Sequence, residues 1–222
     1  MVKEYRNIEL RNNHCSNHNN FSHTNLIKNI STERFCFTCV ACIHLFYSAR
    51  AKKPAWLESY SPSGSFVLAT VHRAENTDDP GRLTEIIRAL NSINRSVPII
   101  LPAHPRTKNI IEASGIDLDF KPVDPVGYLE MIYLLKNCEY ILSDSGGLQK
   151  EAYFFKKSCL ILKDETEWPE LVEHGANQIV GADYNRIIDA VTNLDMNIGY
   201  DSQYYGDGCA AEKIVDYLQF SV

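Results

Sequence analysis

The chain has 222 residues, of which 45% are hydrophobic, and its formal net charge is −6. This acidic balance offers no basic surface for a phosphate backbone, so we expect no nucleic-acid partner. No apolar run reaches the ~20 residues of a membrane-spanning helix, so we expect no membrane partner. The seven cysteines form no small disulfide scaffold, which favours free thiols in a reducing compartment, the cytoplasm.

Composition divides the chain into three parts. Residues 1–34 are rich in Asn and His and have no apolar period, which predicts a disordered leader. Residues 35–64 contain a short helical pattern, interpreted as part of an interdomain helix, and then a linker rich in Pro, Ser and Gly. Residues 65–222 show apolar runs separated by amphipathic segments, which predicts one folded domain.

Six apolar runs in the third part predict β-strands, with helical patterns between them. We expect strands at 66–71, 97–101, 118–123, 139–142, 159–162 and 178–180, and helices at 80–93, 107–113, 126–135, 147–155, 169–174, 184–194 and 210–218. This alternation predicts an α/β fold, a parallel Rossmann-like sheet with helices on both faces. Ligands of such sheets bind at the carboxyl ends of the strands, which is where the polar clusters of this chain fall.

The strand expected at 139–142 leads into the segment Ser143–Ala152, with the sequence SDSGGLQKEA. A strand that turns through Ser145, Gly146 and Gly147 into a helix leaves free N–H groups at the helix start, and these favour a phosphate. Glu151 follows about one and a half turns later, within reach of a ribose hydroxyl. The alternative is a tight turn in which Ser145 only caps the helix.

Two further strand ends carry basic residues. His72 and Arg73 follow the first strand, where they would suit anion binding and acid–base chemistry; the alternative is a solvated loop. His104 and Arg106 follow the second strand, where Arg106 would clamp an anion; the alternative is a Pro-started helix with surface charges.

The remaining strand ends, and one cysteine cluster, favour structural interpretations. Residues 122–128 form a rigid turn that would also suit the wall of a pocket for a flat ring. Residues 163–170 are interpreted mainly as a helix start, with Lys163 and Trp168 as candidate pocket residues. Cys36, Cys39 and Cys42 have part of an iron–sulfur spacing, but the fourth cysteine is missing, so we predict no metal site there.

Taken together, these strand ends resemble the signatures of the UDP-N-acetylglucosamine 2-epimerases. The similar segments are Thr70–Asn76, His104–Thr107, Ser143–Ala152, Thr166–Glu170 and Tyr205–Ile214. The resemblance implies a glycosyltransferase-B-like architecture of two Rossmann-type domains, of which this chain is similar to the C-terminal one. The family converts UDP-GlcNAc to UDP-ManNAc by elimination and re-addition of UDP, without a cofactor or a metal.

The resemblance also implies roles for single residues. It assigns Ser145, Gly146 and Gly147 to the diphosphate of UDP and Glu151 to the ribose hydroxyls. The family lines its uracil pocket at the positions of Val126 and Met131.

Four other positions carry weaker implications. Trp168 stands where many members have an Arg that contacts the substrate. His72 matches the catalytic or phosphate-contacting His of the family. Arg73 and His104 match positions that bind a second, regulatory UDP-GlcNAc in some bacterial members.

The family's carboxylates for proton transfer at C2 belong to its first domain, and no acid in residues 1–64 matches them. We therefore expect this chain to supply the UDP-binding half of an epimerase, with a complementing N-terminal domain or a homodimer as partner. One alternative is a non-catalytic UDP-sugar-binding remnant of a truncated epimerase. The other is a glycosyltransferase of the same architecture, against which the segment His72–Asn76 speaks.

Overall fold

The computed structural model describes residues 47–48, 50–195, 198–200 and 204–205. Contacts group Arg50–Tyr204 into one compact unit. The expected leader 1–34, the cysteine cluster 36–42 and the helix at 210–218 lie outside the described residues. The division into three parts therefore stays a prediction.

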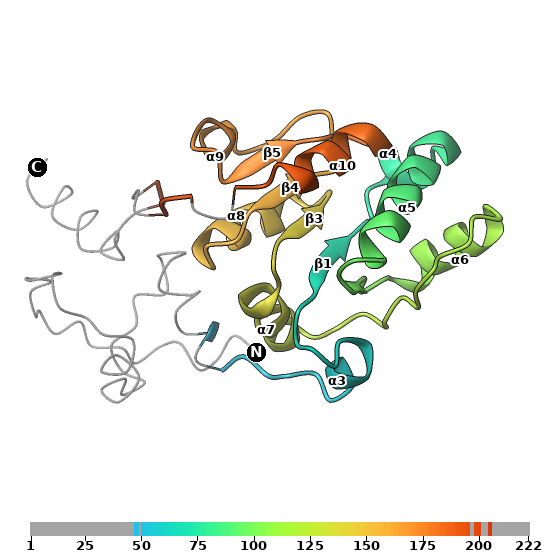
Figure 1. Cartoon of the computed structure of the whole chain (residues 1–222), viewed down its shortest axis with the longest axis horizontal. Coiled ribbons are helices and arrows are strands. Elements are labelled where there is room, and N and C mark those ends of the chain that lie inside the picture. Colours follow the sequence, from blue (N-terminus) through green and yellow to red (C-terminus); the bar gives the residue numbers. More distant parts are fainter. Residues whose placement is uncertain (1–46, 49, 196–197, 201–203, 206–222) are drawn as a thin grey trace, which may run out of the picture. The chain divides into compact units, whose positions relative to one another are not determined.

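Five parallel strands form one sheet in the order β2-β1-β3-β4-β5 (Figure 1). The strands are β1 Val67–Thr70, β2 Ile99–Ile100, β3 Ile141–Ser143, β4 Cys159–Ile161 and β5 Asn177–Ile179. A parallel bridge between Pro102 and Val123 extends the sheet beyond β2. When this bridge is counted as a strand, the order becomes 3-2-1-4-5-6, that of the doubly wound dinucleotide-binding folds.

The expectation of a full strand at 118–123 is wrong, because only Val123 makes a bridge there. The cause is the side chain of Asn91, whose amide donates to the carbonyl of Asp117 at 2.8 Å and accepts from the N–H of Asp119 at 2.9 Å. These backbone groups are therefore bonded to a helix side chain, and the segment approaches the sheet only at its end.

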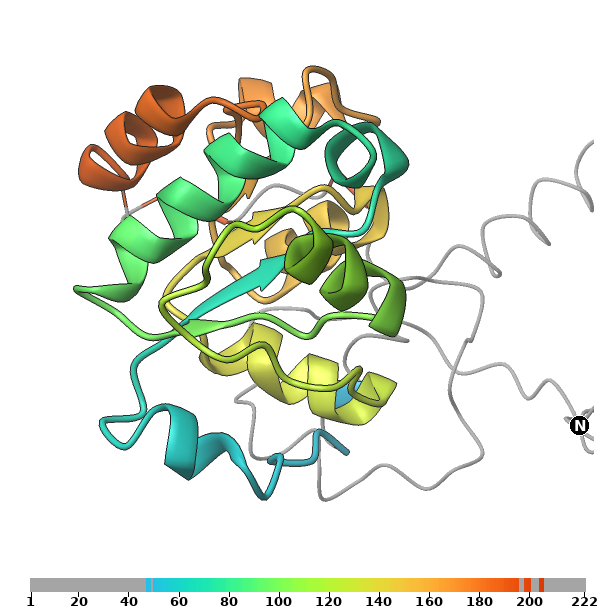
Figure 2. The same cartoon turned by 90° about the vertical axis from the view of Figure 1, so that its right-hand side faces the viewer.

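Helices cover both faces of the sheet (Figures 1 and 2), as the α/β prediction requires. The longer ones are α5 Pro80–Asn94, α6 Pro105–Ala113, α7 Tyr128–Asn137, α8 Gly146–Phe154 and α10 Tyr184–Thr192. The short ones are α3 Leu57–Tyr60, α4 Ala74–Thr77 and α9 Pro169–Glu173, and the sequence pattern does not predict the first two. No helix among the described residues is long and apolar enough to cross a membrane, and the cytoplasmic location stays a prediction.

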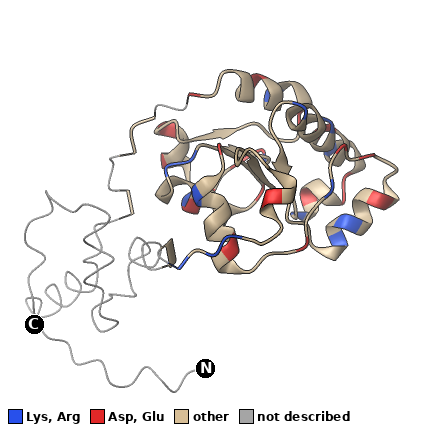
Figure 3. Ribbon diagram, turned by 60° about the horizontal axis from the view of Figure 1, so that its bottom comes forward, with Lys and Arg blue, Asp and Glu red and all other residues tan. Residues whose placement is uncertain are grey.

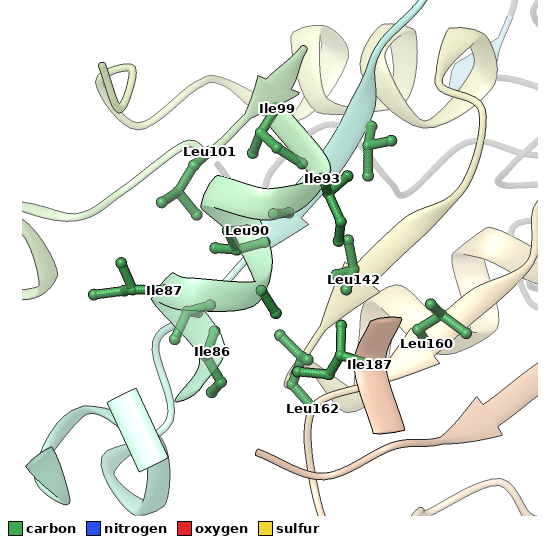
Figure 4. Packing of buried hydrophobic residues seen from close by; sticks show 14 of the residues in the cluster. Ile86, Ile87, Leu90, Ile93, Ile99, Leu101, Leu142, Leu160, Leu162 and Ile187 are labelled. Atoms are coloured by element: carbon green, nitrogen blue, oxygen red, sulfur yellow. The ribbon is translucent and has the colours of Figure 1, made fainter. Parts of the chain in front are cut away.

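One large apolar cluster packs α5, α6 and α10 against one face of the sheet. It includes Val67 and Ala69 but not Leu68, because neighbouring strand residues point to opposite faces. Figure 4 shows how the apolar stripe of α5 meets the strands; its labelled members are Ile86, Ile87, Leu90, Ile93, Ile99, Leu101, Leu142, Leu160, Leu162 and Ile187. Leu68 and Ile141 are fully buried on the other face, where α8 contacts β3 and β4.

The end of α8 places a lysine in an unfavourable backbone conformation. Lys156 has a φ of 56°, in the left-handed region. Its N–H donates to the carbonyl of Tyr153 at 3.0 Å, and the N–H of Lys157 donates to that of Ala152 at 2.9 Å. These two bonds form a Schellman motif, in which glycine usually takes the left-handed position.

We expect Lys156→Gly to raise the free energy of unfolding by about 0.5–1 kcal/mol, because glycine removes the backbone strain at a small entropic cost. Urea denaturation of the full chain measures the change. Lys157→Gly is the matched control and should lower stability, since Lys157 does not have a positive φ. An equal response of the two variants would contradict the strain at Lys156.

Candidate functional site

The site lies where the carboxyl ends of β1 and β3 are neighbours at the centre of the sheet. From β1 the chain passes through α5 to β2 on one side, and from β3 it passes through α8 to β4 on the other. Loops that diverge from adjacent strands in this way leave a crevice, the usual ligand site of doubly wound sheets. The two loops carry His72 and Arg73 after β1, and Asp144 and Ser145 after β3.

Asp144 joins the two loops. Its side chain is fully buried, and its carboxylate accepts hydrogen bonds from the N–H of His72 (2.9 Å) and of Arg73 (2.9 Å). It also accepts from Nδ2 of Asn76 (3.2 Å) and lies 3.0 Å from Nδ1 of His72. Our sequence reasoning did not single out Asp144, although an acid that directly follows a buried strand is a usable signal.

Asn76 extends this network towards the next loop. It is buried in α4, and its amide also donates to the carbonyl of Leu162 at 2.8 Å. Its Oδ1 accepts from Nε of Arg82 at 3.1 Å, and Arg82 forms an ion pair with Asp164 at 2.9 Å. The loop after β4 is thereby tied to the loop after β1.

The pair of His72 and Asp144 is polarised. The hydrogen bond that Nδ1 of His72 donates to Asp144 raises the pKa of the His72 imidazole above its ordinary value, against the opposing effect of burial. Burial by itself would raise the pKa of Asp144, but the hydrogen bonds from His72 and Arg73 outweigh it and leave that pKa lowered. His72 is half-exposed and uses Nδ1 on Asp144, so Nε2 is the nitrogen left for a ligand.

The Ser-Gly-Gly turn forms the start of α8, as predicted. Oγ of Ser143 accepts from the N–H of Ser145 at 2.9 Å and pairs with the hydroxyl of Thr70 at 2.7 Å. Ser145 is the N-cap of α8, and its Oγ accepts from the N–H of Leu148 at 3.4 Å. Within the described part of the chain, the N–H groups of Gly146 and Gly147 donate to no protein acceptor, so they remain available to an anion.

A pocket of about 260 Å³ opens between the two loops. Its volume is below the ~300–1,000 Å³ usual for small-molecule sites, so it suits one ring of a larger ligand. Its lining contains five of the predicted site residues, namely His72, His104, Val126, Met131 and Ser145. Larger hollows, such as one of about 600 Å³ beside α3 and α7, contain none of the predicted residues.

Two other predicted residues, Trp168 and Arg73, lie near the start of α8 but outside the lining of this pocket. Nε1 of Trp168 donates to the carbonyl of Gly146 at 2.7 Å, and the ammonium of Lys150 lies 4.0 Å from the centre of a Trp168 ring. Arg73 forms an ion pair of 3.4 Å with Glu167. The start of α8 is thus surrounded by one aromatic side chain and several charges.

Glu151 and Arg106 also lie outside the pocket lining. Glu151 is on α8, where its Oε1 accepts from the hydroxyl of Tyr128 at 3.1 Å, and burial raises its pKa. Arg106 forms an ion pair of 2.8 Å with Asp78, so its guanidinium already has an acidic partner. Figure 3 shows that acidic and basic residues are interspersed over the described domain.

The structure describes no group of three His, Cys, Asp or Glu residues placed to hold a metal ion between residues 50 and 195. Cys138 and Cys159 are free and buried, and burial raises the pKa of Cys138 to about 12. Their thiols are therefore protonated near neutral pH and are not activated as nucleophiles.

We expect Asp144→Asn to lower the pKa of His72, because the carboxylate that favours the charged imidazole is lost. NMR titration of the His72 ring measures this. The raised pKa stabilises the wild type below pH 6.5, and this contribution is lost as the pH rises through the folded-state pKa. The variant should lack this pH dependence, and its free energy of unfolding should be lower by about 1–3 kcal/mol.

Asp78→Asn is the control for this experiment, since it makes the same chemical change near Arg106 and does not contact His72. Its His72 should titrate as in the wild type. An unchanged His72 midpoint in Asp144→Asn would remove Asp144 as the group that sets the charge of the imidazole.

The sequence of the chain is similar to those of known proteins. A family model described as UDP-N-acetylglucosamine 2-epimerase matches residues 37–219. The UDP-2,3-diacetamido-2,3-dideoxy-D-glucuronate 2-epimerase of Pseudomonas aeruginosa is 51% identical over 176 residues, which are 78% of this chain and 49% of that protein. The UDP-N-acetylglucosamine 2-epimerase of Methanocaldococcus jannaschii is 38% identical over 174 residues, 75% of this chain and 48% of that protein.

Solved structures agree with the sequence relatives. The UDP-GlcNAc 2-epimerase of Methanocaldococcus jannaschii, in complex with UDP-GlcNAc and UDP, aligns with a TM-score of 0.66 at 35% identity. The alignment covers 88% of this chain and 57% of that one. The chain spans about half the length of the curated relatives that it matches. It belongs to the UDP-N-acetylglucosamine 2-epimerase family.

Proposed function

We propose that the chain is the nucleotide-binding half of a UDP-sugar 2-epimerase, acting on UDP-GlcNAc or a closely related 2-acetamido sugar. The observation that carries this proposal is the joint placement of His72 and the open start of α8 in one pocket. The relatives support UDP as the nucleotide of the ligand, because both of their names specify a UDP-linked 2-acetamido sugar.

In this proposal, different residues bind different parts of the ligand. Val126 and Met131 supply apolar walls for the uracil ring, and the N–H groups of Gly146 and Gly147 face the diphosphate at the positive end of the α8 dipole. Glu151 accepts from the ribose hydroxyls further along the helix. His104 lines the same pocket as His72, so a regulatory nucleotide sugar bound by His104 and Arg73 would lie against the first ligand.

In the proposed reaction a base removes the proton at C2, and the bond between C1 and the UDP oxygen breaks to leave a glycal. UDP then adds back to C1, and a proton returns to the opposite face of C2. Negative charge develops on the leaving diphosphate, where His72 and the helix dipole stabilise it. The residues of this chain therefore bind and hold UDP.

The base comes from elsewhere in this proposal. None of the described residues that line the pocket is Asp or Glu, which supports a complementing N-terminal domain as the source of the carboxylates. The competing interpretation is a remnant that binds the nucleotide sugar without converting it. The Pseudomonas relative favours a second candidate substrate, a UDP-diacetamido glucuronate.

Deuterium incorporation separates these outcomes. The full chain is incubated in heavy water with UDP-GlcNAc and, separately, with UDP-2,3-diacetamido-2,3-dideoxy-glucuronate, while calorimetry measures UDP binding. We expect UDP binding and no exchange at C2 by the chain alone, and exchange with one of the sugars once the N-terminal half of the Pseudomonas relative is added. Exchange by the unaided chain would show that it is a complete epimerase, and absence of UDP binding would refute the proposal.

We expect Glu151→Ala to weaken UDP binding by about 1–3 kcal/mol, the loss of hydrogen bonds to a carboxylate. Binding of 2′,3′-dideoxy-UDP should not change, since it has no ribose hydroxyl for Glu151. Glu112→Ala, an exposed acid on α6, is the control and should bind both nucleotides as the wild type does. An equal loss of affinity for UDP and for its dideoxy analogue would show that Glu151 does not bind the ribose hydroxyls.

A further inference from the structure

A carboxylate lies against the first residue of α8. A Cβ atom added to Gly146 would come within 2.9 Å of Oε2 of Glu167 and within 3.0 Å of its Cδ. Real Cβ atoms essentially never approach this closely, so glycine leaves the room in which the carboxylate sits. In contrast, a Cβ at Gly147 would meet only Oγ of Ser145, at 4.0 Å.

The same carboxylate holds two cations. Oε1 of Glu167 lies 2.6 Å from Nζ of Lys163 and 3.4 Å from Nη2 of Arg73. The side chain of Lys163 is only 6% exposed, whereas that of Glu167 is 41% exposed. A buried ammonium requires a counter-charge, and Glu167 supplies it from a position open to solvent.

A diphosphate at the start of α8 would meet the same groups. It carries the same sign of charge as Glu167 and is attracted by the same helix dipole, by Lys163 and by Arg73. Two anions at this place would repel each other, while the buried Lys163 needs only one of them. An exposed carboxylate can turn into water at little cost, but a buried lysine cannot.

Building on the proposed function, we propose that Glu167 is a displaceable counter-charge that occupies the cations of the diphosphate site in the free protein. Binding of UDP moves the carboxylate away from Gly146 and transfers Lys163 and Arg73 to the diphosphate. Release of UDP returns Glu167 to these cations. The exchange keeps Lys163 paired in both states and reduces the net gain from binding UDP, which suits a site that releases UDP and takes it back during one turnover.

The test is Glu167→Gln, measured by calorimetry with UDP and with uridine. We expect UDP to bind about three- to tenfold more tightly, the size of one partly exposed charge interaction, and uridine to bind unchanged. The free variant should melt at a lower temperature than the wild type, and UDP should raise its melting temperature by more, because the diphosphate then supplies the missing counter-charge.

Glu165→Gln is the matched control, since Glu165 lies in the same loop, is exposed and makes the same change in net charge. It should bind UDP as the wild type does. If Glu167→Gln does not fold, Glu167→Asp keeps the charge but shortens the reach to Lys163, and UDP affinity should rise by a smaller factor. Unchanged or weaker UDP binding by the Glu167 variants would overturn the displacement, whereas a wild type that binds no UDP would refute the proposed function itself.

Discussion

The arrangement of the site depends on the buried carboxylate of Asp144. A fully buried charge is unfavourable unless hydrogen bonds compensate it, and all of its donors come from residues 72–76, beyond β1. This requirement fixes the loop after β1 against the loop after β3, although 70 or so residues of sequence separate them. The imidazole of His72 and the start of α8 therefore face one crevice, because the buried carboxylate of Asp144 needs hydrogen bonds from the loop after β1.

Local pattern predicted what local forces determine. The apolar spacing of α5 and the Ser-Gly-Gly turn before α8 gave the helices, and the short apolar runs gave five of the six expected strands. The sixth failed because Asn91 takes the hydrogen bonds of a segment more than 20 residues away. Asp144 was missed for the same reason, since its donors are distant in sequence and leave no periodic signal.

The charges of the site explain how an acidic chain is suited to an anionic ligand. Arg73 and Lys163 share Glu167, Arg82 pairs with Asp164, and Arg106 pairs with Asp78. The basic side chains near the strand ends thus form ion pairs with acids of the same domain. For this reason the negative net charge of the chain does not reveal that cations lie at the site. Under the displacement proposed for Glu167, an anion gains from these cations by exchanging with a carboxylate, so affinity at this site is a difference between two ion pairings and not the sum of new contacts.

The two candidate substrates differ in the sugar that is attached to UDP. In the proposed function the pocket binds the uracil ring and the diphosphate, and the names of the two relatives share the UDP while differing in the sugar. A UDP grip common to both cannot discriminate between them. Among the described residues, Nζ of Lys150 lies 4.0 Å from the centre of a ring of Trp168, whose Nε1 donates to the carbonyl of Gly146 at the start of α8. Under the proposed function, the choice of sugar therefore depends on groups other than the shared contacts to UDP.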